Sequence, residues 1–171
     1  FCLQASQGGS ATLVLLPEAT LTPFGTDLRA AEGLEHQDQM PENVPDPETL
    51  PSLRETMGAL DIPEARAQAF ERPFDMRYIT EPLFLPWQGS QDSYNAVWVK
   101  ALAPLPDDPQ IHRAALAYVS DYTMMEPILR RHGRSWGERG MNVASLDHAM
   151  WFHRPARADE WLLYVQHSPS A

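Results

Sequence analysis

One short stretch of the sequence, residues 145–155, gathers many of the side chains that could act as acids, bases or nucleophiles. It runs Ser-Leu-Asp-His-Ala-Met-Trp-Phe-His-Arg-Pro. Its alternation is typical of a β-strand, in which successive side chains point to opposite faces. One face then carries Leu146, His148, Met150 and Phe152, and the other carries Ser145, Asp147, Ala149, Trp151 and His153. The first face is predicted to be core and the second to be half polar.

A Ser–His–Asp hydrolase is the first chemistry that this stretch suggests, and strand geometry argues against it. Ser145 and His148 project to opposite faces, so the imidazole cannot take the proton of the hydroxyl. We expect His148 to be a hydrogen-bonded core histidine, and Asp147 and His153 to be structural partners. A metal site made of Asp147, His148 and His153 is disfavoured because their spacing does not converge on one point.

The elements around this stretch predict an α+β domain. Strands are expected at 74–79, 94–102, 141–153 and 160–167, because β-branched and aromatic residues concentrate there. A helix is expected at 110–126, with Asp108 as its cap and Pro109 in its first turn. Pro127 should kink or end it, and Gly133 is a plausible C-terminal cap further on. A long helix between strands is expected to cover one face of a sheet.

The predicted helix has an apolar stripe with an acid at its margin. The stripe consists of Ile111, Ala115, Tyr118, Val119, Tyr122 and Met125. Ala114, Ala117 and Asp121 form a second row beside it. An acid flanked by small residues can approach a ligand closely, although a solvated helix acid is the simpler interpretation of Asp121.

The first 70 residues are less regular. Phe1–Ser6 alternates like a strand, whereas Gly8–Ala31 has no firm role and is interpreted as a poorly packed insert. Glu32–Ser52 contains four prolines among acids and amides, and we expect an extended linker without a core. Leu53–Phe70 predicts a short helix that is interrupted near Pro63.

Composition limits the possible functions. The chain has 171 residues, 43% of them hydrophobic, and a net charge of −10, which disfavours broad binding of nucleic acid. Its single cysteine, Cys2, excludes an internal disulfide and suits a reducing, intracellular compartment. No apolar run approaches the ~18 residues of a membrane span. The apolar segment Ala11–Pro17 is short and lacks a preceding basic region, so we do not expect a signal peptide.

Two basic clusters could bind an anionic substrate. One consists of Arg130, Arg131, His132 and Arg134, and the other of Arg154 and Arg157. A solvated basic turn that complements the helix dipole is the simpler interpretation of the first. Trp98, Trp151 and Trp161 are interpreted as core residues.

The run Ala144–Pro155, followed by Arg157–Tyr164, closely resembles the acyl-CoA thioesterase II family. Its specific part is Asp147-His148-Ala149-Met150-Trp151-Phe152-His153. Weaker matches are Ala117–Tyr122, Glu35-His36-Gln37 with Met40-Pro41, Phe1–Ser6 and Val97–Ala101.

The resemblance implies a double hotdog, in which each unit is a curled antiparallel sheet wrapped around a central helix. Residues 1–6 would then be the last strand of a truncated first hotdog, and 7–31 an atypical insert. Residues 32–69 would be a Pro-rich linker with a short helix, and 70–171 an incomplete second hotdog. Family members continue with two further strands, so the chain is expected to be a fragment.

The resemblance also implies hydrolysis of fatty acyl-CoA to a free fatty acid and coenzyme A. It assigns the catalytic aspartate to Asp121 and the hydroxyl to Ser145, while the family's third residue, a glutamine, has no counterpart. Arg130, Arg131 and Arg154 are candidate substrate-binding residues. No cofactor or metal is expected. The full-length form is expected to be a homo-oligomer, in the peroxisomal matrix if eukaryotic or the cytoplasm if bacterial.

Two alternatives stay open. The chain could be a catalytically silent form that binds acyl-CoA or pairs with a full-length subunit. It could also fail to fold stably alone, because loss of two strands leaves an unpaired sheet edge.

Overall fold

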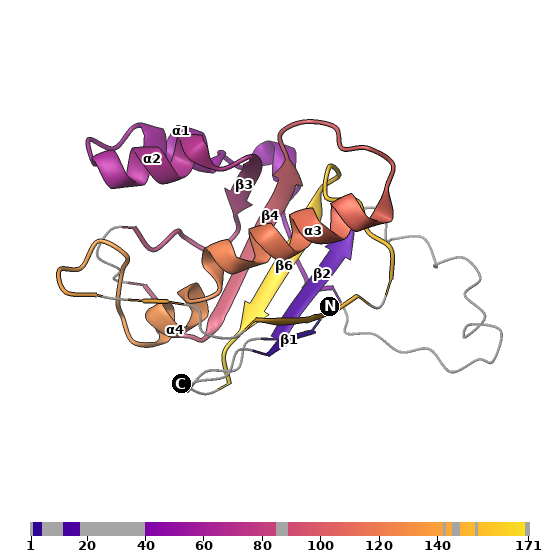
Figure 1. The fold of residues 1–171 in the computed structure, drawn as a ribbon. Coiled ribbons are helices and arrows are strands. Elements are labelled where there is room, and N and C mark those ends of the chain that lie inside the picture. Colours follow the sequence, from indigo (N-terminus) through magenta and orange to yellow (C-terminus); the bar gives the residue numbers. More distant parts are fainter. Residues whose placement is uncertain are drawn as a thin grey trace.

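Four antiparallel strands form the main sheet, in the order β2-β6-β4-β3 (Figure 1). They are β2 (Thr12–Pro17), β3 (Phe74–Tyr78), β4 (Tyr94–Ala101) and β6 (Leu162–His167). The computed structural model describes residues 2–4, 12–17, 40–84, 89–141, 143–144, 148–152 and 154–169. The strands predicted at 74–79, 94–102 and 160–167 are confirmed, with small differences at their ends.

Strand β2 was not predicted. It pairs with β6 from Thr12 opposite His167 to Pro17 opposite Leu162, so the interpretation of 8–31 as a poorly packed insert is wrong for these residues. The physical reason is the edge of the sheet. Strand β4 occupies one side of β6. The backbone N–H and C=O groups on the other side of β6 would be unpaired without a further strand, and the apolar run at 12–17 pairs with them.

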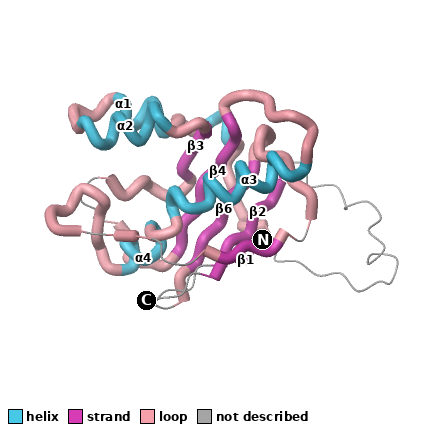
Figure 2. The backbone as a smooth tube through the Cα atoms, in the orientation of Figure 1, coloured by secondary structure: helices cyan, strands magenta, loops and turns pink. Residues whose placement is uncertain are grey.

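Helix α3 (Pro109–Ser120) runs across one face of the sheet (Figures 1 and 2). It begins as predicted, since Asp108 accepts a hydrogen bond from the backbone N–H of Gln110 and Pro109 lies in the first turn. It ends earlier than the predicted Glu126, passing at Ser120 into a 3-10 turn, η4 (Asp121–Thr123). A separate helix, α4 (Glu126–Arg131), follows.

Pro127 lies in the first turn of α4 rather than ending a longer helix, because proline lacks the N–H that an interior position needs but suits a first turn. Gly133 follows α4 with a φ of 63°, and its N–H donates to the carbonyl of Arg130. The predicted C-terminal cap is therefore confirmed.

The helix-facing side of the sheet builds the larger core. Alternate strand residues, among them Met76, Val97, Val99, Leu162 and Tyr164, pack with Leu116 and Val119 of α3. The buried stripe of α3 is offset from the predicted one, since His112, Leu116, Val119 and Ser120 are buried. Tyr118 is 57% exposed. It pairs edge-on with Tyr122 at the margin of the helix, with ring centroids 5.2 Å apart.

The opposite side of the sheet has a second core, in which Trp98, Trp161 and Leu163 pack against Met40, Val44 and Leu50. The prediction that 32–52 supports no core is therefore wrong for 40–50. The Trp98 indole donates to the carbonyl of Pro45 over 3.0 Å and the Trp161 indole to Glu48 Oε1 over 2.8 Å. A short 3-10 helix, η3 (Pro47–Thr49), lies between these anchors.

The helical hairpin that follows η3 agrees with the sequence prediction. Helix α1 (Leu53–Gly58) and helix α2 (Pro63–Glu71) are separated at Pro63, as predicted. A capping box starts α1, because Ser52 Oγ accepts from the Glu55 N–H while Glu55 Oε2 accepts from the Ser52 N–H. Leu53 and Met57 join the larger core.

The chemistry-rich stretch forms a shorter strand than predicted. Within 141–153, the described residues form a strand only at β5 (Ala149–Trp151), which pairs with β1 (Cys2–Gln4). Met150 and Phe152 contact the larger core as expected. His148 and Trp151 are exposed, so both predictions of burial were wrong, and Trp151 is 49% exposed because a two-stranded ribbon leaves its outer face to solvent. In the part of the chain that is described, no helix combines the length and apolarity needed to cross a membrane.

Candidate functional site

Asp121 lies where α3 ends and η4 begins. Its side chain is exposed, beside a residue that is almost fully buried, Ser120. The last carbonyls of an α-helix lack partners within the helix, so groups outside it can hold them. The position of the Asp121 carboxylate therefore depends on how Ser120 is held.

The hydroxyl of Ser120 contacts the stretch that carries the family motif. Ser120 Oγ lies 3.2 Å from His148 Nε2 and donates to the carbonyl of Ala117 over 2.8 Å. Because the hydroxyl has one proton, it accepts from Nε2–H of His148 when it donates to Ala117. Ser145 itself lies outside the described residues, as do Asp147 and His153. The described end of the motif is thus bonded to the neighbour of Asp121.

The carbonyl of Ser120 ends a buried chain of polar side chains. The Tyr164 hydroxyl donates to it over 2.6 Å and accepts from Gln166 Nε2 over 2.9 Å. Asn95 Nδ2 donates to Gln166 Oε1 over 2.7 Å, and Thr80 Oγ1 donates to Asn95 Oδ1 over 2.5 Å. We call Thr80, Asn95, Gln166 and Tyr164 the relay. It crosses from β4 to β6, where Asn95 lies directly opposite Gln166.

Every member of the relay has a fixed hydrogen-bonding role. A backbone carbonyl only accepts, so Tyr164 must donate to Ser120 and accept from the amide of Gln166. That orients the Gln166 amide, which in turn orients Asn95. Both ends of Gln166 are occupied within the relay. Because Gln166 is also only 1% exposed, it is not placed to hold a water molecule beside the exposed Asp121.

Burial raises the pKa of the Tyr164 hydroxyl above its ordinary value, and the charges of Glu126 and Asp121 add to the rise. The hydroxyl therefore stays protonated and keeps its donor role. Sequence reasoning missed the relay. The available signal was a pair of polar residues, Asn95 and Gln166, at core-facing positions of two predicted strands.

Glu126 is a buried acid, 1% exposed, that no sequence pattern singled out. Its Oε1 accepts from the Tyr78 hydroxyl over 2.9 Å and from the Trp136 indole over 3.4 Å. Burial raises the pKa of the Glu126 carboxyl to about 7, although the hydrogen bonds from Tyr78 and Trp136 and the charge of Arg130 oppose the rise. Among the described atoms, Glu126 Oε2 has no hydrogen-bond partner.

The three candidate substrate-binding arginines lie in different surroundings. Arg130 is 2% exposed, donates to the carbonyl of Glu81 over 2.6 Å and lies near Glu126. This burial favours a structural role for Arg130. Arg131 is exposed, and Arg154 is half-buried. Substrate binding by these residues stays a prediction.

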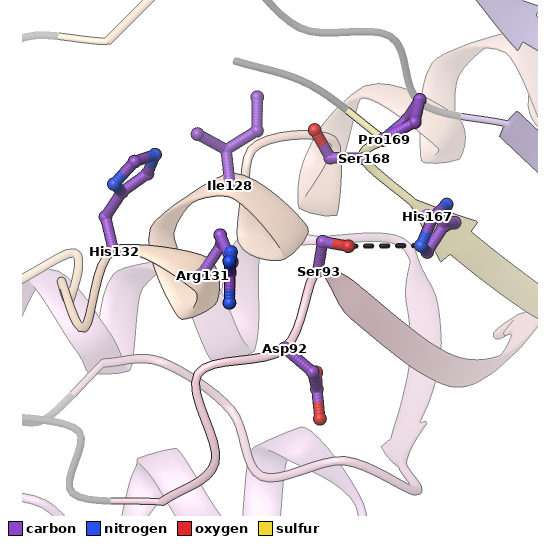
Figure 3. Close-up of a pocket in the computed structure, with 8 residues that line it drawn as sticks. All are labelled: Asp92, Ser93, Ile128, Arg131, His132, His167, Ser168 and Pro169. Atoms are coloured by element: carbon purple, nitrogen blue, oxygen red, sulfur yellow. Dashed lines mark hydrogen bonds between the residues drawn. The ribbon is translucent and has the colours of Figure 1, made fainter.

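Arg131 lines a cavity of about 590 Å³ between α4, the segment before β4 and the end of β6 (Figure 3). His132 and His167 also line it, and Ser93 Oγ lies 3.1 Å from His167 Nε2. The Asp92 carboxylate also lines the cavity, and it accepts from the Ser90 hydroxyl and from the N–H of Tyr94. The cavity combines an arginine with two imidazoles, a set that suits an anionic group. No cluster of His, Cys, Asp and Glu suited to a metal occurs among the residues that the structure describes.

Comparison with solved structures supports the fold. The crystal structure of the acyl-CoA thioesterase II TesB2 from Mycobacterium marinum is 35% identical, with a TM-score of 0.58. The similarity covers 99% of this chain and 60% of that chain. The predicted α+β, hotdog-like arrangement of an antiparallel sheet around a helix is confirmed, with the sheet open rather than closed.

Comparisons with known sequences agree with this result. A model of the acyl-CoA thioesterase family matches residues 65–171. Acyl-CoA thioesterase 2 of Haemophilus influenzae is 35% identical over 147 residues, covering 82% of this chain and 50% of that protein. Acyl-coenzyme A thioesterase 8 of Mus musculus is 33% identical over 152 residues, covering 81% and 45% respectively. The chain thus spans about half the length of these curated relatives. It belongs to the acyl-CoA thioesterase family.

Proposed function

We propose that the chain supplies the water-activating side of an acyl-CoA thioesterase, with Asp121 as the base and Ser145 beside it. The observation that carries the proposal is the junction at Ser120. Its hydroxyl contacts His148 of the motif, and its successor in the chain is Asp121. Ser145 lies only three residues before His148 in the sequence, which supports its assignment as the partner of Asp121.

The proposed reaction is hydrolysis of the thioester of a fatty acyl-CoA. The Asp121 carboxylate accepts a proton from water while the water oxygen attacks the thioester carbonyl. The hydroxyl of Ser145 accepts or donates a hydrogen bond that holds this water in line. The carbon–sulfur bond then breaks, the fatty acid forms, and the proton passes from Asp121 to the leaving thiolate of coenzyme A.

The anionic part of coenzyme A needs local cations, because the chain carries a net charge of −10. The cavity at Arg131 supports a binding site for phosphate groups there. Arg131 Nη1 donates to the carbonyl of Gln91 over 2.8 Å, which fixes the side chain while other guanidinium N–H groups stay available. His132 and His167 line the same cavity.

Binding of acyl-CoA without turnover is the second candidate, either by this chain alone or paired with a full-length subunit. A general base works best on a water molecule that further groups hold in place, and water is held less well at an exposed carboxylate. The exposure of Asp121 therefore favours binding without turnover. Equilibrium binding of acyl-CoA without release of the free thiol would support this candidate over hydrolysis.

Release of coenzyme A from medium-chain acyl-CoA, measured with a thiol reagent, tests the proposal. Asp121→Asn should lower kcat by about 10²–10⁴-fold, the usual contribution of a general base. Asp108→Asn is the matched control, since it makes the same acid-to-amide change at the other end of α3 and asparagine still caps a helix. Turnover that survives Asp121→Asn, or that falls equally in Asp108→Asn, would refute the role of Asp121.

A further inference from the structure

We infer that Tyr164 is a positioning residue for Asp121, acting through the carbonyl of Ser120 and itself oriented by Gln166, Asn95 and Thr80. The inference rests on the proposed role of Asp121 as the base. It adds residues outside the specific motif at 147–153, on strands β4 and β6 and at Thr80.

The first argument is the geometry at the end of α3. The Tyr164 hydroxyl donates to the Ser120 carbonyl over 2.6 Å, one peptide unit before Asp121. The chain changes there from an α-helix to a 3-10 turn, where the pattern of backbone hydrogen bonds changes. A bond from a rigid strand to this carbonyl therefore fixes the point from which Asp121 projects.

The second argument is the rigidity of the donor. Tyr164 is buried in the middle of β6, opposite Val97 of β4. Its hydroxyl has no freedom to rotate, because Gln166 donates to it and Gln166 is held by Asn95. Buried polar groups cost free energy unless they are paired, so a fully paired relay in the core favours one arrangement.

The third argument is that Ser120 is held from two sides. Tyr164 bonds to its carbonyl, while His148 lies against its hydroxyl. The first contact ties the end of α3 to the sheet, and the second ties it to His148 at the described end of the motif. Ser120 is thus held from two directions, one residue before Asp121.

The test compares two tyrosines on the same face of the sheet, of which Tyr164 is buried and Tyr78 partly buried. Tyr164→Phe removes the hydroxyl that holds Ser120, whereas the control Tyr78→Phe removes one that holds Glu126. For each full-chain variant, kcat and KM are measured with medium-chain acyl-CoA, and backbone hydrogen exchange is followed at residues 121–123. Gln166→Met is a second variant that keeps the Tyr164 hydroxyl but removes its donor.

For Tyr164→Phe we expect kcat to fall by about ten- to hundredfold with KM unchanged, because a small misplacement of a reacting group has effects of this size. Exchange at 121–123 should become faster. Gln166→Met should show the same changes to a smaller extent, and Tyr78→Phe should show neither.

Unchanged exchange at 121–123 in both relay variants would overturn the inference, as would a loss of kcat shared by Tyr78→Phe. An altered exchange rate with unchanged kcat would reduce the relay to a structural role and also overturn it. The proposed function is tested separately, on turnover by the unmodified chain and by Asp121→Asn. If the unmodified chain has no turnover, the proposed function falls, while exchange at 121–123 still decides whether Tyr164 holds this segment.

Discussion

In the central sheet, the side chains of β3, β4 and β6 place different kinds of polar groups on the two faces. On the face toward α3, hydrogen bonds run between side chains, from Thr80 through Asn95 and Gln166 to Tyr164. On the opposite face, tryptophan indoles and an arginine reach out to the segment 45–50. The first set of bonds ends at the helix terminus that bears Asp121. The second set ends on residues 45–50, which cover the opposite face of the sheet and are called the covering segment below.

This difference shows how one strand serves two purposes. In β6, Leu162, Tyr164 and Gln166 face the helix, while Leu163 faces the covering segment. Because strand side chains alternate, each strand contributes both to positioning and to attachment of the cover. A substitution on the face toward α3 should therefore lower both stability and activity. A substitution on the opposite face should lower stability alone.

The largest predicted effect compares Leu162→Ala with Leu163→Ala. Both leucines are fully buried, on adjacent positions and opposite faces. Each substitution should lower the free energy of unfolding by about 2–5 kcal/mol, the usual cost of removing a buried leucine side chain. Urea denaturation measures both. A much smaller loss in Leu163→Ala would show that the segment 40–50 does not form a core with the sheet.

The next largest predicted effect concerns Glu126, whose contribution to the free energy of unfolding depends on pH. Its pKa in the folded chain is raised from 4.5 to about 7 by burial. A raised carboxyl pKa means that the folded chain binds the proton more tightly than the unfolded chain, so the contribution of Glu126 to stability is greatest below about pH 4.5 and falls until about pH 7. The loss over this range is roughly 3 kcal/mol, from about 1.4 kcal/mol per unit of pKa.

Glu126→Gln should remove this pH dependence, because glutamine does not titrate and can still accept from Tyr78. Thermal or urea unfolding of both proteins between pH 4.5 and pH 8 provides the measurement. The quantity to follow is the difference in free energy of unfolding, which should move in favour of the variant as the pH rises. A constant difference across this range would mean that Glu126 does not titrate there.

Arg77→Lys should lower the free energy of unfolding by a smaller amount, and it should disturb only the face of the sheet opposite α3. The Arg77 guanidinium donates to the carbonyl of Pro47 over 2.8 Å and to Asp75 over 3.0 Å, and it stacks over the Trp161 ring. Lysine cannot reproduce these bonds together, because its ammonium is a single point charge. We expect a loss of about 1–2 kcal/mol in urea denaturation. Faster limited proteolysis within 40–50, without change in kcat, would accompany it.

The sequence was sufficient for the parts of the fold that follow from local patterns. The strands at Phe74–Tyr78, Tyr94–Ala101 and Leu162–His167, the Asp108 cap and the Gly133 turn were all predicted. These features depend on periodicity and on residues with special backbone properties. The motif at 147–153 identified the family, which the comparisons confirmed.

The failures involve partners that are distant in the sequence. Propensity and composition treat Pro45 and Pro47 as linker residues, whereas their carbonyls bind Trp98 and Arg77 some 30 to 50 positions away. The strand at Thr12–Pro17 likewise depends on an edge formed at the other end of the chain. Ser145 lies outside the described residues, and the position of Asp121 alone does not test its role. The roles of both residues therefore stay predictions.

The smallest predicted effect concerns one hydrogen bond between the sheet and its cover. Trp98→Phe keeps an aromatic ring in the outer core but removes the indole N–H that donates to the Pro45 carbonyl. The lost hydrogen bond should cost about 1 kcal/mol, its usual net value, in addition to the cost of a smaller ring in a buried site, with kcat unchanged. Trp151→Phe is the matched control, because its side chain is largely exposed and its replacement should be neutral within about 0.5 kcal/mol. Equal losses of stability in the two variants would mean that the hydrogen bond from Trp98 to the Pro45 carbonyl adds nothing to the free energy of unfolding. Apolar contact alone would then hold the covering segment on the sheet.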